Sequence, residues 1–415
     1  MATKITAPEG QRFACKDCPA RCCRLPARVR LTGEEAARYL AEPWVRERAT
    51  EEGLGIIEGG ALPVREIDGG PACVFLDDDM RCAMQKRFGH DYLPRTCQAF
   101  PFAFTRDEEG VIVAQLSKLC PSIRDDYGEP VAPQLRTKLQ QAGGAARMAA
   151  EMEMLGGTSL AQAHYLRVVR RWEAALVEKE PAATTLARLY DMTLAFEGAL
   201  PVDRITDAAV DDALGRAFAI DPEPLAPRPS PSIHARMLFA SLLGHLCHPA
   251  RVKLAHRIGD ARGARGTGWR ILANKVRWMM GWGSVDMAFI ARPVRLGRVK
   301  AVQRFLAESK GALVTGYLRL VLQRRQVFAQ PRHLLAVLID LAIATTLASR
   351  FARCRAAAEE RTRVTADDVR EGIGVAELLV LGHVDPAAQG PSMTNLRRML
   401  LTSRDALRGV LATEA

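Results

Sequence analysis

The stretch "LLAVLIDLAIATTLAS", residues 334–349, decides the fold class expected for this chain. It lies between His333 and Arg350, is 16 residues long and carries one carboxylate, Asp340, near its centre. A membrane-spanning helix needs about 20 apolar residues, and a central charge makes insertion more costly. We therefore interpret the stretch as a buried helix of a mainly α-helical protein, and we expect no membrane association.

Helical periodicity surrounds this stretch from about residue 135 onward. Apolar residues recur at three- and four-residue spacing in 135–155, 159–179 and 182–200. A proline-rich segment at 221–232 predicts a linker. The further helices that we expect are 233–247, 268–281, 296–308, 311–328, 331–357 and 366–382. Thr365, with Asp368 three residues on, predicts the N-cap of the last one.

Residues 1–130 differ from the rest of the chain in charge and in turn content. They carry 18 Lys and Arg against 21 Asp and Glu, a net charge of −3, whereas the other 285 residues carry 40 against 26, a net charge of +14. Their turn-rich sequence predicts short helices and hairpins at 73–82 and 103–116. We expect an irregular N-terminal cysteine domain at 1–130, a helical domain at 131–220 and a helical C-terminal domain at 233–415.

Cysteine is concentrated in the same N-terminal part. Eight of the ten cysteines are there: Cys15, Cys18, Cys22, Cys23, Cys73, Cys82, Cys97 and Cys120. The sequence begins with no apolar secretory segment, so we expect a cytoplasmic protein whose thiols stay reduced. Dense cysteines in a reducing compartment indicate metal ligands rather than disulfides. We predict that all eight bind metal and that Cys247 and Cys354 are buried on apolar helix faces.

The identity of the metal stays open at this point. Zinc takes four ligands per site, so eight thiolates could form two sites. A [4Fe–4S] cluster also takes four, which leaves four for a second centre or for redox work. The adjacent Cys22 and Cys23 point in different directions, so one of them can serve another site. We interpret His90, between Cys82 and Cys97, as a surface histidine.

The cysteine segments resemble a known family. The stretches "FACKDCPARCCR" (13–24), "CVFLDDDMRCAMQKRFGHDYLPRTCQAFPF" (73–102) and "LSKLCPSI" (116–123) are similar to the YkgJ-type zinc- or iron-chelating family, and most similar to its flagellin lysine N-methylases. The matching positions are Cys73, Asp77–Asp79, Cys82, Gln85–Lys86, Thr96–Cys97, Phe100–Pro101 and Cys120–Pro121. The resemblance implies an iron–sulfur cluster and S-adenosylmethionine-dependent methylation of surface lysines on flagellin.

The residues alone do not identify a methyltransferase. No strand–GxGxG–helix pattern is present, and the radical spacing C-x3-C-x2-C that Cys18 and Cys22 begin is broken by Leu25. A lysine amine, with an unperturbed pKa near 10.4, must lose its proton before it attacks a methyl group. The side chains that could take that proton are Tyr39, Tyr92, Tyr127, Tyr317 and Asp91, and the sequence does not choose among them. We assign no catalytic or cofactor-binding residue, and a non-enzymatic or redox metal-chelating protein is the alternative.

A basic segment raises one further hypothesis. Residues 251–300 hold 12 Lys and Arg against two acids, with Trp269, Trp278 and Trp282 between them. Such a pattern could bind nucleic acid or an acidic protein. We favour packing of Trp278, Met279 and Trp282 on the core with the basic side chains in solvent, and we do not expect nucleic-acid binding.

Overall fold

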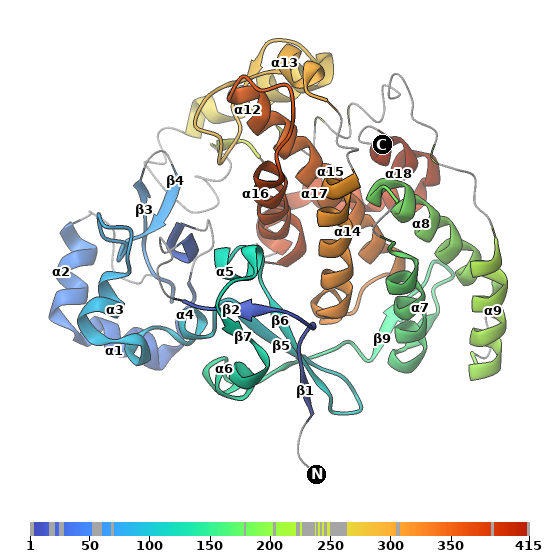
Figure 1. Ribbon diagram of the computed structural model, residues 1–415, viewed down its shortest axis with the longest axis horizontal. Coiled ribbons are helices and arrows are strands. Elements are labelled where there is room, and N and C mark those ends of the chain that lie inside the picture. The colour runs from blue at the N-terminus through green and yellow to red at the C-terminus, as the bar shows by residue number, and fades with distance from the viewer. Residues whose placement is uncertain are drawn as a thin grey trace.

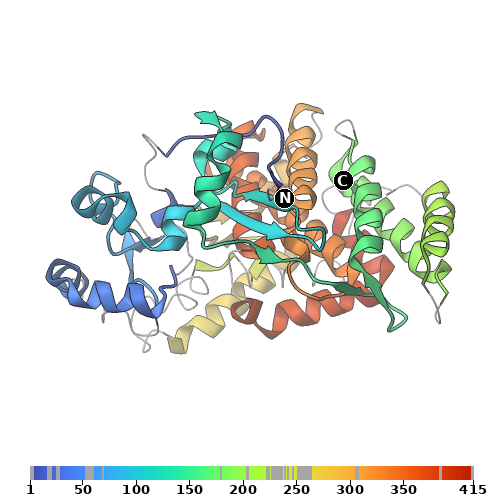
Figure 2. The same cartoon turned by 90° about the horizontal axis from the view of Figure 1, so that it is seen from below.

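The computed structural model describes most of the chain, and the described part is mainly α-helical, as the sequence predicts. The described residues are 4–15, 21–24, 29–51, 60–67, 70–177, 180–201, 205–220, 264–303, 308–382 and 386–412, with single positions between 225 and 249. The body is elongated, with α1 (Gly33–Ala41) near one end and α9 (Asp207–Ala219) near the other (Figures 1 and 2). The linker at 221–232 and the helix expected at 233–247 lie almost entirely outside the described residues.

A single long helix, α15 (Leu334–Ala358), forms the centre of the helical body. It has the length and apolar composition of a membrane span, but 89% of its most apolar window is buried inside the protein. The helices that contact it are α8 (Ala182–Ala199), α13 (Leu296–Ala301), α16 (Ala366–Ala376), α17 (Pro386–Thr402) and α18 (Arg404–Leu411). The apolar run at 334–349 is therefore a core helix, as we predict from its length.

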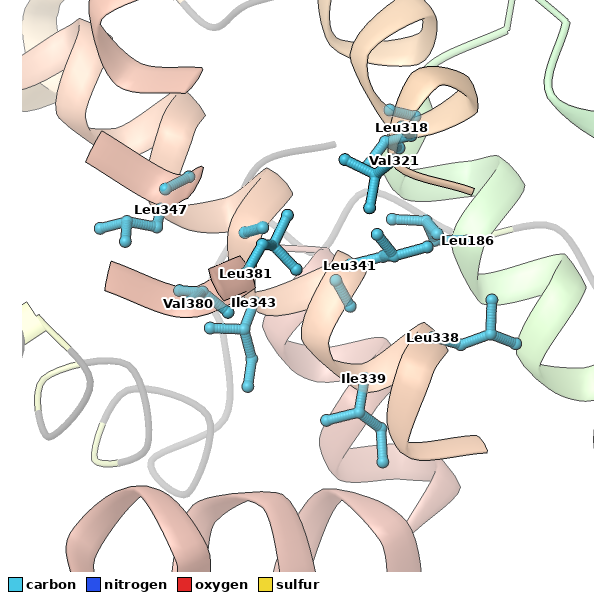
Figure 3. Close-up of a cluster of buried hydrophobic side chains, with 14 of the residues drawn as sticks. Leu186, Leu318, Val321, Leu338, Ile339, Leu341, Ile343, Leu347, Val380 and Leu381 are labelled. Carbon is cyan, nitrogen blue, oxygen red and sulfur yellow. The ribbon is translucent and has the colours of Figure 1, made fainter. Parts of the chain in front are cut away.

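The core around α15 is continuous with its neighbours. Leu338 and Leu341 of α15 lie near Leu186 of α8 and near Leu318 and Val321 of α14 (Glu308–Gln323) (Figure 3). All five side chains are buried. This cluster extends from the segments near residue 150 to the C-terminal helix, so the helices on both sides of residues 221–232 share one hydrophobic core.

Two local features explain how α15 accommodates the buried Asp340 and the close approach of α16. The buried Asp340 carboxylate accepts hydrogen bonds from Arg332 Nη1 and Arg397 Nε, both at 2.7 Å. A buried charge needs such partners. On α16, Gly372 faces the backbone of α15, where an added Cβ would lie 2.3 Å from the Ala348 carbonyl oxygen. Glycine is thus required there for close helix packing.

The start of α16 confirms the predicted cap. The Thr365 side chain accepts from the Asp368 amide, and the Asp368 carboxylate accepts from the Thr365 amide, which completes the capping box. After Ala376 the helix widens into a π-helical segment, η6 (Glu377–Gly382). The predicted helix at 366–382 therefore has a change of helical type in its last six residues.

A small sheet lies between the cysteine-bearing elements and the helical body. Its order is β1–β6–β5–β8, formed by β1 (Ile5–Thr6), β6 (Ile112–Leu116), β5 (Phe102–Arg106) and β8 (Ala146–Arg147). The hairpin predicted at 103–116 is confirmed, because β5 and β6 pair antiparallel with Phe104 opposite Ala114. β1 and β8 add parallel edges.

The helix predicted at 135–155 is wrong over most of its length. α6 ends at Gln141 (Leu135–Gln141), and β8, β9 (Glu151–Glu153) and β10 (Ser159–Ala161) follow. The physical reason is the pair Gly143 and Gly144, whose φ angles of 76° and 120° leave the helical region. α7 (Gln162–Ala175) resumes the helical pattern.

The remaining differences are shifted helix ends and three helices that the sequence did not predict. α13 stops at Ala301 and α14 starts at Glu308, whereas α9, α17 and α18 were not predicted. The stretch from 268 to 281 lies in α12 (Ala264–Met280), where Trp278 packs against the core. The expected burial of Trp282 is wrong: its side chain is 62% exposed, because it follows the positive-φ turn at Gly281 that ends α12.

Candidate metal centre

Five of the eight predicted metal-ligand cysteines come together in the N-terminal region. Cys22 and Cys23 lie in η1 (Arg21–Arg24), Cys73 ends β4 (Gly70–Cys73), Cys82 precedes α3 (Ala83–Phe88) and Cys97 lies in α4 (Arg95–Ala99). The Cys23 thiol is hydrogen-bonded to the thiols of Cys22, Cys73 and Cys82. Cys97 lies within electrostatic range of Cys73, Cys22 and Cys82. We call these five residues the thiol cluster.

Local hairpins bring these thiols together from distant parts of the sequence. β3 (Val64–Ile67) pairs antiparallel with β4, and β4 contacts η1. A tight loop then returns the chain, so that Leu76 bridges to Cys82 and the Asp77 amide donates to the Arg81 carbonyl at 2.9 Å. This loop is the hairpin predicted at 73–82.

The acidic loop Asp77–Asp79 has a structural role. Lys86 Nζ contacts Asp77 Oδ2 at 3.0 Å and Asp79 Oδ2 at 2.6 Å. Arg48 Nη2 reaches the other Asp77 oxygen at 3.2 Å. These pairs tie the loop to α3 and to α2 (Pro43–Glu51), the helices that flank it. Asp77 and Asp79 of the loop are therefore engaged by cations.

Cys82 is the thiol best placed to be a thiolate. Its hydrogen bond with Cys23, helped by the backbone N–H groups of Gln85 and Met84, lowers the pKa of Cys82 to about 7 despite burial. Those amides belong to the first turn of α3, where N–H groups have no carbonyl partner within the helix and can stabilise a thiolate. Thiolate is the form that binds metal. Cys82 can therefore hold a soft cation near neutral pH.

The other thiols are shifted in both directions. The hydrogen bond with Cys23 lowers the pKa of Cys22. The pKa of Cys23 itself is raised by its hydrogen bonds to the thiols of Cys22, Cys73 and Cys82. Burial, together with the negative charge of neighbouring thiolates, raises the pKa of Cys97. Several thiolates this close repel one another unless a cation compensates them. The soft donor set fits zinc or an iron–sulfur cluster.

The thiols are gathered but not arranged as a closed ligand shell. Among the residues that the structure describes, no three His, Cys, Asp or Glu side chains have the spacing of a metal site. Cys18, which follows Cys15 by three positions, lies outside the described residues. The thiol cluster therefore supplies the ligand chemistry of a metal site without its closed geometry.

An aromatic shell encloses the inner side of the thiol cluster. Cys73, Cys82 and Cys97 pack against a small core whose buried members are Tyr39, Val45, Leu62, Val74, Phe75, Met84 and Leu93. Trp44 stacks on Phe75 with ring centroids 5.9 Å apart, and the Tyr39 hydroxyl donates to the Tyr92 carbonyl at 2.7 Å. Such a shell limits solvent access and would tune a bound metal.

The other predicted ligands lie elsewhere. Cys15 is exposed and lies within electrostatic range of Lys138, which is in α6. Cys120 is buried in a separate core with Phe13, Phe102 and Ile123. Cys247 and Cys354 are buried in the helical core, as we predict. The His90 side chain is partly exposed and lies 4.0 Å from the Asp91 carboxylate.

A second candidate site is a cavity that the sequence does not indicate. Its volume is about 690 Å³, within the range of roughly 300–1,000 Å³ typical of small-molecule sites. The walls come from the segment after β1, from β6, α5 (Pro121–Asp125), α7, α14 and α16. Tyr317 is the one wall residue among the candidate proton acceptors, whereas Asp91 and Tyr127 are exposed. Lys118, Glu173 and Gly316 also line it, and no sequence motif marks them.

The comparisons with known proteins identify no relative. No family model, no curated protein and no solved structure matches this chain. The fold and site define a mainly helical protein with a cysteine-rich N-terminal region, and a more particular assignment rests on the residues themselves.

Proposed function

We propose that this chain is an iron–sulfur protein that methylates lysine side chains of a protein substrate. The observation that carries the metal part is the convergence of Cys22, Cys23, Cys73, Cys82 and Cys97, contributed by four separate elements. Methylation, with S-adenosylmethionine as the methyl donor and flagellin as the substrate, rests on the resemblance of 13–123 to the flagellin lysine N-methylases. The proposal places the protein in the cytoplasm, where thiols stay reduced.

The chain's own residues would perform three tasks at the centre. Cys82 provides a thiolate near neutral pH, and the neighbouring thiols complete a soft donor set. The aromatic shell around Tyr39 and Phe75 excludes water from the inner side. An iron–sulfur cluster, when bound, supplies one-electron chemistry that amino acid side chains lack. Cys15, Cys18 and Cys120 remain proposed ligands of the same or a second centre.

The first experiment decides the metal. The protein would be purified anaerobically and analysed for iron, acid-labile sulfide and zinc, with the Cys23→Ala variant as the matched control. We expect iron and sulfide in comparable amounts in the wild type and neither in the variant. A colourless wild-type protein with stoichiometric zinc and no sulfide would contradict the iron–sulfur proposal.

The second experiment decides the activity. Co-expression of the cluster-loaded protein with a flagellin, followed by intact mass analysis, should give increments of one methyl group each. The Cys23→Ala variant should give none. Unmodified flagellin beside a fully loaded protein would instead favour the second candidate, a non-enzymatic or redox metal-chelating protein. That candidate is favoured by the same thiol cluster, which by itself requires no methyl transfer.

A further inference from the structure

The cavity beside α14 has a wall that lacks a side chain. Gly316 lies in the middle of α14, and nothing would lie within 4 Å of a Cβ added to it. Glycine in a helix interior lowers stability relative to alanine, and here no close packing requires it. Leu313, Tyr317 and Leu320, which line the same cavity, share this face of the helix. The missing side chain thus leaves open space beside an apolar wall.

A network of buried polar groups adjoins the cavity wall at Lys118 and Tyr317. Glu377, the first residue of the π-helical segment, accepts hydrogen bonds from Ser117 Oγ at 2.7 Å, from the Lys118 amide and from Arg324 Nη1 at 3.2 Å. Single π-helical turns occur often at functional sites. The Tyr317 hydroxyl, on a side chain only 4% exposed, interacts with the Glu377 carboxylate and so belongs to the same polar network.

The cavity wall also holds cations that are only partly neutralised. Lys118 Nζ donates to the Ile123 carbonyl at 2.6 Å and to Gln11 Oε1 at 3.4 Å, both uncharged, and the described chain places no carboxylate at ion-pair distance from it. The closest carboxylate oxygen to Arg370 is that of Asp125, at 3.9 Å. Arg124, by contrast, is fully engaged by Asp125 and Glu371. An ammonium held by neutral groups has a donor left for an anion.

We propose that this cavity binds a small organic anion, whose apolar part lies against the α14 face at Gly316 and whose acidic group contacts Lys118 and Arg370. The two positions line the same cavity, so a single molecule can reach both. Tyr317 would contribute its ring to the apolar wall of the site. The proposal goes beyond the proposed function, because it requires neither a metal at the thiol cluster nor methyl transfer.

Two fluorescent probes with the same body separate the apolar from the ionic contribution. 8-Anilinonaphthalene-1-sulfonate carries an acidic group, and N-phenyl-1-naphthylamine is its neutral counterpart. Both would be titrated into the folded full-length protein, and the probe stoichiometry and Kd would be measured. We expect one saturable site for each probe, with the sulfonate bound more tightly.

Three variants and one control then test the location. Gly316→Phe fills the open space and should weaken both probes by about tenfold or more, whereas Gly215→Phe, at an exposed glycine of α9 with equal space, should change neither. Lys118→Met should weaken the sulfonate about tenfold and leave the neutral probe unchanged. Arg370→Gln should also weaken binding of the sulfonate probe. This variant leaves intact the hydrogen bond that Lys118 makes to the Ile123 carbonyl.

Several outcomes would overturn the proposal. Absence of saturable binding of either probe, or equal affinities in Gly316→Phe and the wild type, would show that the cavity is not a site. Equal loss of both probes in Lys118→Met and Arg370→Gln would show that these residues support structure and do not recognise an anion. Gly316→Leu, a smaller filler, provides the same test if Gly316→Phe loses its near-ultraviolet circular dichroism.

Discussion

The thiol cluster region and the helical body are stabilised in different ways. The buried core beneath the thiols consists of seven side chains in the described residues, whereas the core around α15 extends through most helices of the body. A small core rarely stabilises a fold by itself, and natural proteins supplement it with metals or cross-links. We therefore expect the N-terminal region to depend on its cysteines for stability and the helical body not to depend on them.

The largest expected effect is removal of the metal. Apparent binding free energies of thiolate metal sites reach about 10–16 kcal/mol, and much of that energy folds the surrounding chain. Cys23→Ala removes the thiol that contacts three others, so bound metal should fall from stoichiometric to near zero. Limited proteolysis with mass analysis should then show cleavage within 29–100 and a resistant helical fragment.

Cys354→Ala is the matched control, because Cys354 is equally a cysteine but is buried in the helical core. It should keep its metal and its proteolytic pattern. Equal loss of metal in both variants would contradict the division between the two regions. Cleavage of the helical body in the metal-free Cys23→Ala variant would also contradict this division.

The second effect tests the other side of the comparison. Leu338→Ala truncates a fully buried side chain of α15 that lies near α8 and α14. Loss of such a side chain lowers the free energy of unfolding by about 2–5 kcal/mol, because a cavity remains. Urea denaturation should show this loss, with metal content unchanged. A drop in metal content would show that the two regions do not fold separately.

The third effect is pH-dependent and again confined to the helical body. Burial raises the pKa of Glu197 to about 7, and its side chain is only 3% exposed. The folded protein therefore holds this proton more tightly than the unfolded chain does. Stability contributed by Glu197 is present below about pH 4.5 and is lost as the pH rises to about 7.

Glu197→Gln removes this loss. The variant should be more stable than the wild type by about 3 kcal/mol at pH 8 and by less than about 1 kcal/mol at pH 5. His333, 4.0 Å away, has a pKa lowered by burial and is present in both proteins, so its contribution cancels to first order. Urea denaturation at the two pH values measures the difference. A constant difference would show that Glu197 ionises normally.

Much of the helical body could be predicted from the sequence, because its signals are local. The run at 334–349 and the cap at Thr365 depend only on neighbouring residues, and both are confirmed. The helix forecast at 135–155 is wrong because apolar periodicity outweighed Gly143 and Gly144. A local sequence pattern predicts a helix well unless one or two residues adopt backbone angles outside the helical region.

The site could be predicted only as a set of residue types. Cysteine density indicates metal, but which thiols meet depends on the contact of β4 with η1, residues about 50 positions apart. No local pattern contains that contact. The cavity is still harder to predict, because Lys118, Gly316 and Arg370 come from three distant segments.

The smallest effects come from two glycines on adjacent helices, and they should have opposite signs. At Gly372 of α16, an added Cβ meets the Ala348 carbonyl oxygen of α15 at 2.3 Å, so Gly372→Ala must push two helices apart. Such overpacking costs about 1–3 kcal/mol.

At Gly316 of α14 the change to alanine meets open space. It should stabilise the protein by about 0.5–1 kcal/mol, which is the difference in helix propensity between alanine and glycine. Thermal denaturation of the two variants compares a glycine required by packing with one that leaves a cavity open. If Gly316→Ala destabilises the protein, the space beside α14 is structural, and the site inferred there loses the feature that first distinguishes it from the surrounding core.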